Sequence, residues 1–369
     1  MRSQCRTTGA AVAALWILDA GMNVVMAASR CIVAALGMRF QARGNAALAA
    51  AIGAGQLVGF GVGAAPLSLG WLCVGVAVAV VVGALVTASA AARYEADAAT
   101  ALSPPSPPPP PPTINLDSLE ALRRWLAKFQ VPPWMRALAG ATFLSWLGWY
   151  AHIVFTTQWI ASDVCGGNAR AAAGTPEGEA YARGVRLASG ALAAFAAATA
   201  GSGAGLVPAA ARLLGVPRAL AGAYAALAAL LFCTSLVPRD AEWAAVAIVA
   251  CLGLPWAVTQ SLPYAVVAAH APAARRGALL GALNVFVTLP EVTVDLGVKP
   301  LLNAIQGKDA GDGSGAGAVL LAGAFPAALA ALVALFVPDD QVGAVRREGG
   351  DDVGDDDTHE GAALLPTRQ

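Results

Sequence analysis

The chain has 369 residues, of which 57% are hydrophobic and only 12% are charged, a composition that indicates an integral membrane protein. Its formal net charge of +0 offers no basic surface to nucleic acid and argues against nucleic-acid binding. The six cysteines and three histidines show no metal-ligand or nucleophile–base spacing, so no disulfide framework, metal site or enzyme is indicated.

Nine apolar stretches are long enough to cross a bilayer, for which about 20 helical residues suffice. They predict an all-α membrane bundle, because hydrocarbon permits only helices or closed barrels and the alternating pattern of barrel strands is absent. The third stretch is rich in valine and uncharged, so we expect it to face lipid. The nine stretches are 8–36, 45–66, 70–92, 137–161, 184–208, 218–238, 242–268, 277–303 and 317–337.

The first stretch carries an acid, an amide and a base on one stripe. A helix turns about 100° per residue, so Asp19, Asn23 and Arg30 fall within roughly 60° of one another around the axis. Charges at membrane depth are costly and usually face a bundle interior or a water-filled path. The stripe therefore indicates a transport pathway.

A polar linker separates the third and fourth stretches. The run 104–112 is almost all proline and predicts an extended spacer. Residues 116–129 place leucines and aromatics on one helical face with Arg and Lys beside it, which favours a helix lying on anionic headgroups. The alternative is a solvated linker helix packed on a neighbouring loop.

The positions of Lys and Arg predict the orientation. More of them fall on the linker's side of the membrane, which favours a cytoplasmic linker and C-terminus and, with nine spans, an outside N-terminus. The expected organisation is a partial N-terminal half of three spans, a cytoplasmic linker, a six-helix C-terminal half and a disordered acidic cytoplasmic tail. These parts cover residues 1–93, 94–136, 137–338 and 339–369.

The acidic tail contains one short motif. Glu360 lies four residues before Leu364 and Leu365, which resembles an acidic dileucine sorting signal read by clathrin adaptors. Chance occurrence in an acidic tail is the alternative. The expected location is the plasma membrane or, if the signal is used, a vacuolar or endosomal membrane.

Several blocks resemble, in the same order, the helices of plant sucrose/proton symporters. The stripe of Asp19, Asn23 and Arg30 resembles the fourth helix of that family. Further blocks resemble the fifth, seventh, eighth, tenth and eleventh helices. These blocks are the glycines at 55, 59 and 63, then residues 145–167, 181–186, 252–264 and 280–290. The chain is thus similar to the sucrose-transporter branch of the glycoside–pentoside–hexuronide cation symporters.

The resemblance implies a major-facilitator fold of about twelve helices in two halves, with sugar bound between them and the proton as coupling ion rather than a cofactor. The chain begins at the family's fourth helix, so we expect three helices to be missing, as in a truncated gene model or a fragment. The implied activity is proton symport of sucrose or a related disaccharide or glucoside by alternating access. The alternative is a non-transporting relative: a sensor, a scaffold or a truncated product.

The resemblance also points to proton-coupling residues. Asp19 and Arg30 stand where the family has an aspartate and an arginine; a structural Asp–Arg clamp is the alternative. Thr156 and Gln158 stand where it has two aspartates, whereas Asp163 keeps an acid where it has a glutamate. For Asp163 the alternative is a loop-end acid facing water.

A pair of acidic residues lies in the eighth stretch. Glu291, Asp295 and Lys299 follow one another at intervals of four residues and so share a helical face. The family has uncharged residues at the positions of Glu291 and Asp295. We hypothesise that Glu291 or Asp295 takes over a protonation role lost at Thr156 and Gln158, with a kink expected beside Glu291 at the preceding proline. An ion pair of Asp295 with Lys299 at the outer end is the alternative.

Sugar hydroxyls need amide and hydroxyl partners, and sugar rings stack on aromatic faces. Within the matched helices these chemical types predict a set of substrate-binding residues, for which helix packing or interhelical hydrogen bonding is the alternative. The set is Asn23, Trp146, Trp149, Gln158, Gln260, Tyr264 and Asn284.

Overall fold

A computed structural model describes most of the chain between residues 14 and 339. The described residues are 14, 17–18, 21–22, 24–26, 28–30, 32–33, 41–63, 69–100, 130–272, 275–306 and 315–339. Within them every regular element is a helix, which confirms the predicted all-α class. The proline run, the expected amphipathic helix and the dileucine motif lie outside these residues.

Helices occupy the positions of the apolar stretches. The described parts of 14–33 are helical and belong to the first stretch. The later helices are α2 (Gln41–Gly63), α3 (Leu69–Thr100), α5 (Arg136–Gln158), α6 (Pro176–Ala204), α7 (Leu206–Leu214), α8 (Val216–Thr234), α9 (Glu242–His270), α10 (Arg276–Gln306) and α11 (Ala316–Ala334). A short 3₁₀ turn, Pro133–Met135, leads into α5.

Seven of the described helical segments are long and apolar enough to cross a membrane, where nine stretches were expected. The difference includes α2, whose apolar part Ala47–Val62 is shorter than the roughly 20 residues that span a bilayer. Of the expected stretch 45–66, residues 64–66 lie outside the described part of the chain, and polar Asn45 lies before the apolar part. The first stretch is described only in part.

Two local features differ from a set of plain helices. Helix α5 runs into a π-helical turn at Trp159–Val164. The expected span at 184–208 divides into α6 and α7 at Gly205, because Pro208 lacks the N–H that would bond the carbonyl of Ala204. Helix α10 continues without a break through the proline before Glu291, where a kink is expected.

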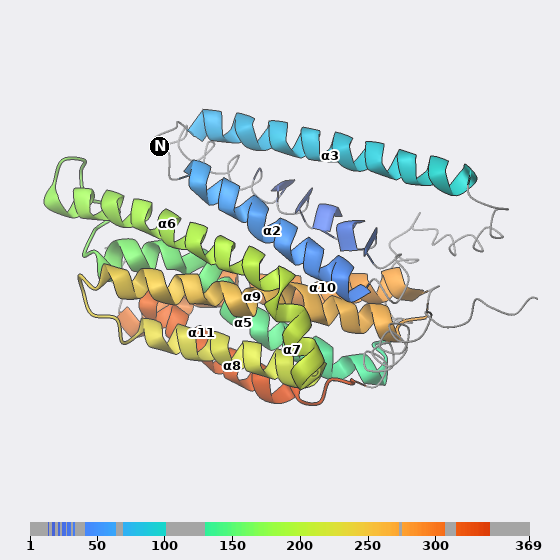
Figure 1. Cartoon of the computed structure of the whole chain (residues 1–369). Helices are drawn as coiled ribbons and strands as arrows, with labels where there is room; N and C mark the ends of the chain where they lie inside the picture. The colour runs from blue at the N-terminus through green and yellow to red at the C-terminus, as the bar shows by residue number, and fades with distance from the viewer. Residues whose placement is uncertain are drawn as a thin grey trace, which may run out of the picture.

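The helices from α5 onward form one bundle, in which α11 packs against α5 and α8, and α6 packs against α9 and α2 (Figure 1). Glycines allow the closest approaches: a Cβ on Gly148 of α5 would lie 2.9 Å from the carbonyl oxygen of Gly323 of α11. The buried side chains form two clusters. One surrounds Leu220 and Leu279, and the other surrounds Trp149 and Trp256.

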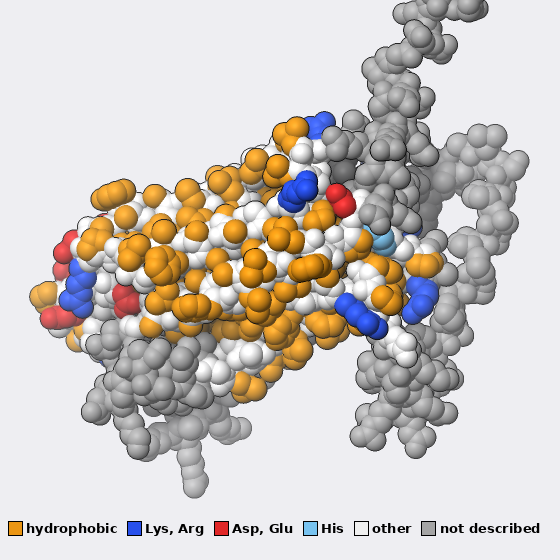
Figure 2. All heavy atoms as spheres, turned by 90° about the horizontal axis from the view of Figure 1, so that it is seen from below, with side chains coloured by type: hydrophobic (Ala, Val, Ile, Leu, Met, Phe, Trp, Pro, Cys, Tyr) orange, Lys and Arg blue, Asp and Glu red, His pale blue; other side chains and the backbone are white. Residues whose placement is uncertain are grey.

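Helix α3 lies at the edge of the molecule, at the top of Figure 1. None of its apolar window Cys73–Ala90 is buried, as expected of a helix that faces lipid. On the face in Figure 2 hydrophobic side chains cover the flank of the bundle, and charged side chains gather toward its two ends. This distribution suits a bundle that spans a bilayer, and the protein is a multi-pass integral membrane protein.

Candidate functional site

A cluster of ring side chains lies inside the bundle at the meeting of α5, α6 and α9. We call it the aromatic cluster. Its members are Trp146, Trp149, Tyr150 and His152 of α5, Phe195 of α6 and Trp256 of α9. Trp256 is at the centre, with ring centroids 4.7 Å from Trp149, 5.5 Å from Trp146 and 5.9 Å from Phe195. Spacings of three and four residues put the α5 members on neighbouring positions of that helix.

Polar groups of α9 border the aromatic cluster. The indole nitrogen of Trp149 donates to the hydroxyl of Thr259 at 3.2 Å. The indole nitrogen of Trp256 is buried and has no hydrogen-bond partner among the described residues. Helix α9 also contains Pro255 and Pro263, and Pro263 lacks the N–H that would bond the carbonyl of Thr259. This segment therefore holds buried hydrogen-bonding groups beside apolar ring faces, as small-molecule sites commonly do.

Arg30 ties the first apolar stretch to this segment of α9. Its side chain is 4% exposed, and its two terminal nitrogens donate to the backbone oxygen and the Oε1 atom of Gln260 at 3.1 and 2.8 Å. The guanidinium carbon lies 3.2 Å from the centroid of the Tyr264 ring. Among the described residues no carboxylate pairs with Arg30, so a buried positive charge is held by an amide and a ring face.

Glu291 of α10 contacts the aromatic cluster through Tyr150. The hydroxyl of Tyr150 donates to its Oε2 atom at 3.0 Å, and the Tyr150 ring lies 5.4 Å from that of Trp146. Glu291 is half-buried, whereas Asp295, one turn further along α10, is exposed. Of the two acids, Glu291 is thus the one in contact with the aromatic cluster.

Asp163 occupies a different place from the other candidates. It lies in the π-helical turn, and its two carboxylate oxygens accept from the backbone N–H groups of Gly315 and Gly317 at 3.1 and 2.7 Å. An acid at a helix N-terminus satisfies free amides and complements the helix dipole. The geometry therefore assigns Asp163 to holding the start of α11.

The structure brings six predicted site residues into one connected region: Arg30, Trp146, Trp149, Gln260, Tyr264 and Glu291. Gln158 at the end of α5 and Asn284 of α10 are half-buried. Asp19 and Asn23 lie outside the described residues, as does the side chain of Lys299. Sequence reasoning did not select Tyr150, His152, Phe195 and Trp256. A signal existed for His152, the one histidine within any of the nine apolar stretches.

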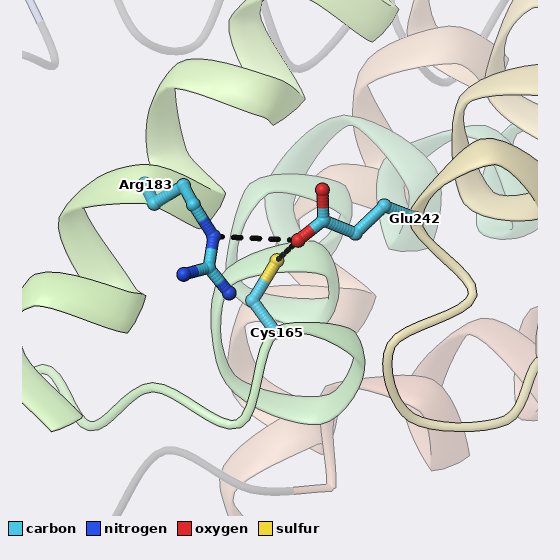
Figure 3. Close-up of polar contacts among 3 residues, drawn as sticks. All are labelled: Cys165, Arg183 and Glu242. Carbon is cyan, nitrogen blue, oxygen red and sulfur yellow. Dashed lines mark hydrogen bonds and ion pairs between the residues drawn. The ribbon is translucent and has the colours of Figure 1, made fainter. Parts of the chain in front are cut away.

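Cys165 is buried directly after the π-helical turn and lies beside an ion pair (Figure 3). Arg183 Nε is 3.3 Å from Glu242 Oε1, and the thiol of Cys165 donates to the same oxygen at 3.7 Å. Burial first, and then the negative charge of Glu242, raise the pKa of the Cys165 thiol to about 11. Cys165 is therefore a protonated, unreactive thiol at neutral pH.

We predict that Cys165, kept as the single cysteine, reacts slowly with N-ethylmaleimide at pH 8. A pKa raised from 9.0 to about 11 reduces the thiolate fraction roughly 100-fold. Glu242→Gln removes the charge that raises the pKa and should speed the reaction, whereas Arg183→Gln should slow it further. Mass spectrometry of timed samples gives the rates, and equal rates in the three proteins would contradict this electrostatic account.

Fold and site together define a class: a multi-pass α-helical membrane protein with buried polar and aromatic groups inside its bundle. The chain is 27% identical over 193 residues to the sucrose transport protein SUT2 of Oryza sativa, in both subspecies indica and japonica. It is 29% identical over 182 residues to the sucrose transport protein SUC4 of Arabidopsis thaliana. The matches cover 47% and 43% of this chain but only 36% and 33% of the relatives. No protein-family model matches the chain.

Proposed function

We propose that this protein moves sucrose, or a related disaccharide or glucoside, across a membrane by proton symport with alternating access. The observation that carries the proposal is the buried set of Arg30, Gln260 and Tyr264 beside the aromatic cluster, in a chain similar to sucrose transport proteins. Guanidinium and amide groups can donate to sugar hydroxyls, and tryptophan faces can stack on sugar rings.

In this proposal α5 to α11 form one half of a major-facilitator bundle, and Arg30 comes from the other half. A contact between halves that is made in one conformation and released in the other is what alternating access requires. Sugar hydroxyls would compete with Gln260 for the guanidinium, so binding would loosen this contact. Sorting through Glu360, Leu364 and Leu365 remains a separate prediction.

The proposal is tested by reconstituting the 369-residue chain into liposomes and measuring uptake of radiolabelled sucrose under an imposed inward proton gradient. We expect saturable uptake above the internal equilibrium level that a protonophore abolishes. Mannitol is the control solute. Sucrose uptake no faster than that of mannitol, with protein correctly inserted, would favour the non-transporting relative.

We predict that Glu291→Gln changes how uptake depends on pH. The carboxylate that accepts from Tyr150 can gain a proton, whereas the glutamine amide cannot, so a step driven by protonation of Glu291 would lose its pH dependence. Asp295→Asn, on an exposed position of the same helix, is the matched control and should keep the parent profile. An unchanged profile in Glu291→Gln would remove Glu291 from proton coupling.

A further inference from the structure

His152 is a titratable side chain buried within the apolar span of α5. Its exposure is 2%, and its ring lies between Trp149, at 5.9 Å between centroids, and Phe195, at 5.3 Å. Its Nδ1 atom lies 2.7 Å from the hydroxyl of Thr156, one turn further along the helix. Ionisable side chains at membrane depth are costly, and they commonly mark proton or substrate pathways.

The partner of His152 suits both protonation states of an imidazole. A hydroxyl can donate to the unprotonated Nδ1 atom or accept from a protonated one, so this hydrogen bond survives when the ring gains a proton. A carboxylate partner would instead favour the charged ring permanently. When Nδ1 carries the hydrogen and donates to the Thr156 hydroxyl, Nε2 is the unprotonated ring nitrogen and is the atom that would take the proton.

Charged and titratable groups on the surrounding helices have other contacts. Glu291 of α10 contacts Tyr150, Arg30 contacts Gln260 and Tyr264 of α9, and Asp163 of the π-helical turn contacts the start of α11. Tyr224 of α8 belongs to the other buried cluster, and α6 presents Phe195 to the ring. Within the described part of the chain, none of these charges or hydroxyls contacts His152. Its protonation is therefore governed mainly by access of water to the ring.

We propose that His152 is a proton-carrying residue of the transport cycle, acting through the Thr156 hydroxyl and the aromatic cluster. The proposal rests on the proposed function. In the packed arrangement without water, the neutral form of the His152 ring is favoured. A charged imidazolium would lose its hydration there, and the neighbouring aromatic side chains offer it only ring faces. A conformation that admits water to Nε2 would bind the proton from that water. Because the two conformations differ in proton affinity, protonation shifts their populations and couples proton movement to sugar movement.

The test compares two modes of transport in liposomes containing His152→Gln, which keeps a hydrogen-bonding side chain but cannot be protonated. Exchange of internal for external sucrose needs no net proton movement, so we expect the substitution to reduce exchange far less than it reduces gradient-driven accumulation. Gradient-driven accumulation should be lost, and the rate of exchange should depend less on pH between 5 and 8 than it does in the parent. His270→Gln is the matched control, since His270 lies at the end of α9, stacked on Trp134, and should behave as the parent.

Two further arms separate the possible failures. His152→Phe fills the same site with an unprotonatable ring and should reproduce the loss of accumulation if His152→Gln is poorly folded. A His152→Gln or His152→Phe protein that accumulates sucrose with the parent's pH profile would overturn the role of His152 and leave the proposed function standing. A parent protein that moves no sucrose in either mode would overturn the proposed function, and the inference with it.

Discussion

Arg30→Met is expected to reduce sucrose transport at least tenfold while leaving the protein as stable as the parent or more stable. The loss of transport follows from removal of a buried donor, because a charge-assisted hydrogen bond contributes about 1.5–3 kcal/mol and 1.4 kcal/mol corresponds to a factor of ten. The stability follows from the partners of Arg30. Among the described residues these are Gln260 and Tyr264, with no carboxylate to offset the burial of the charge.

Desolvation of an ion costs several kcal/mol, whereas Gln260 left without its partner costs about 1–3 kcal/mol. Thermal unfolding followed by size-exclusion chromatography, together with liposome uptake, measures both effects. Arg212→Met, on an exposed residue of α7, is the control and should change neither. Arg30→Met with normal transport would contradict the site. A fall in melting temperature large enough to account for lost transport would support the structural clamp.

Gly253→Ala is expected to lower the stability of the protein by about 3 kcal/mol or more. A Cβ at this position of α9 would clash with the carbonyl oxygen of Phe195. It would also lie 2.8 Å from the Cβ of Ala198 and 3.0 Å from the backbone nitrogen of Thr199. Overpacking a core with extra side-chain atoms typically costs 1–3 kcal/mol, and backbone atoms cannot rotate away as side chains do. Thr199 also donates to the carbonyl of Gly253 at 3.2 Å and would be displaced.

This contact fixes the distance between Phe195 and Trp256, so the aromatic cluster should loosen as α6 and α9 separate. The expected signs are a melting temperature lower by about 10 °C and weaker sucrose uptake. Gly190→Ala on α6 is the matched control, because a Cβ there meets nothing within 4 Å and alanine favours a helix. Equal melting temperatures for Gly253→Ala and Gly190→Ala would contradict this packing.

The positions of the helices were predictable from the sequence because long apolar stretches have few structural options in a membrane. The lipid-facing character of α3 followed from its valines and lack of charge. The division of α6 from α7 and the π-helical turn were not expected. The length and hydropathy of an apolar stretch predict neither the break at the hydrogen bond that Pro208 removes nor a change from α-helical to π-helical geometry.

Some residues of the site were predictable from the sequence, but their contacts were not, because these depend on how the helices pack. Arg30, Gln260 and Tyr264 were selected singly, by chemical type and resemblance, but nothing in the sequence placed them in contact. The alanine-rich helices hide which face is buried, since alanine fits either face. Trp256 and Phe195 were therefore not selected, and the cap formed by Asp163 could not be predicted without knowing where α11 begins.

Intrinsic tryptophan fluorescence during a sucrose titration of the purified chain tests the central claim most directly, namely that sugar binds beside Arg30 and the aromatic cluster. We expect a saturable change that Trp146→Phe or Arg30→Gln abolishes. Trp243→Phe, on an exposed residue of α9, should preserve it. A saturable change that survives unaltered in Trp146→Phe and Arg30→Gln, or no saturable change in the parent, would contradict the account.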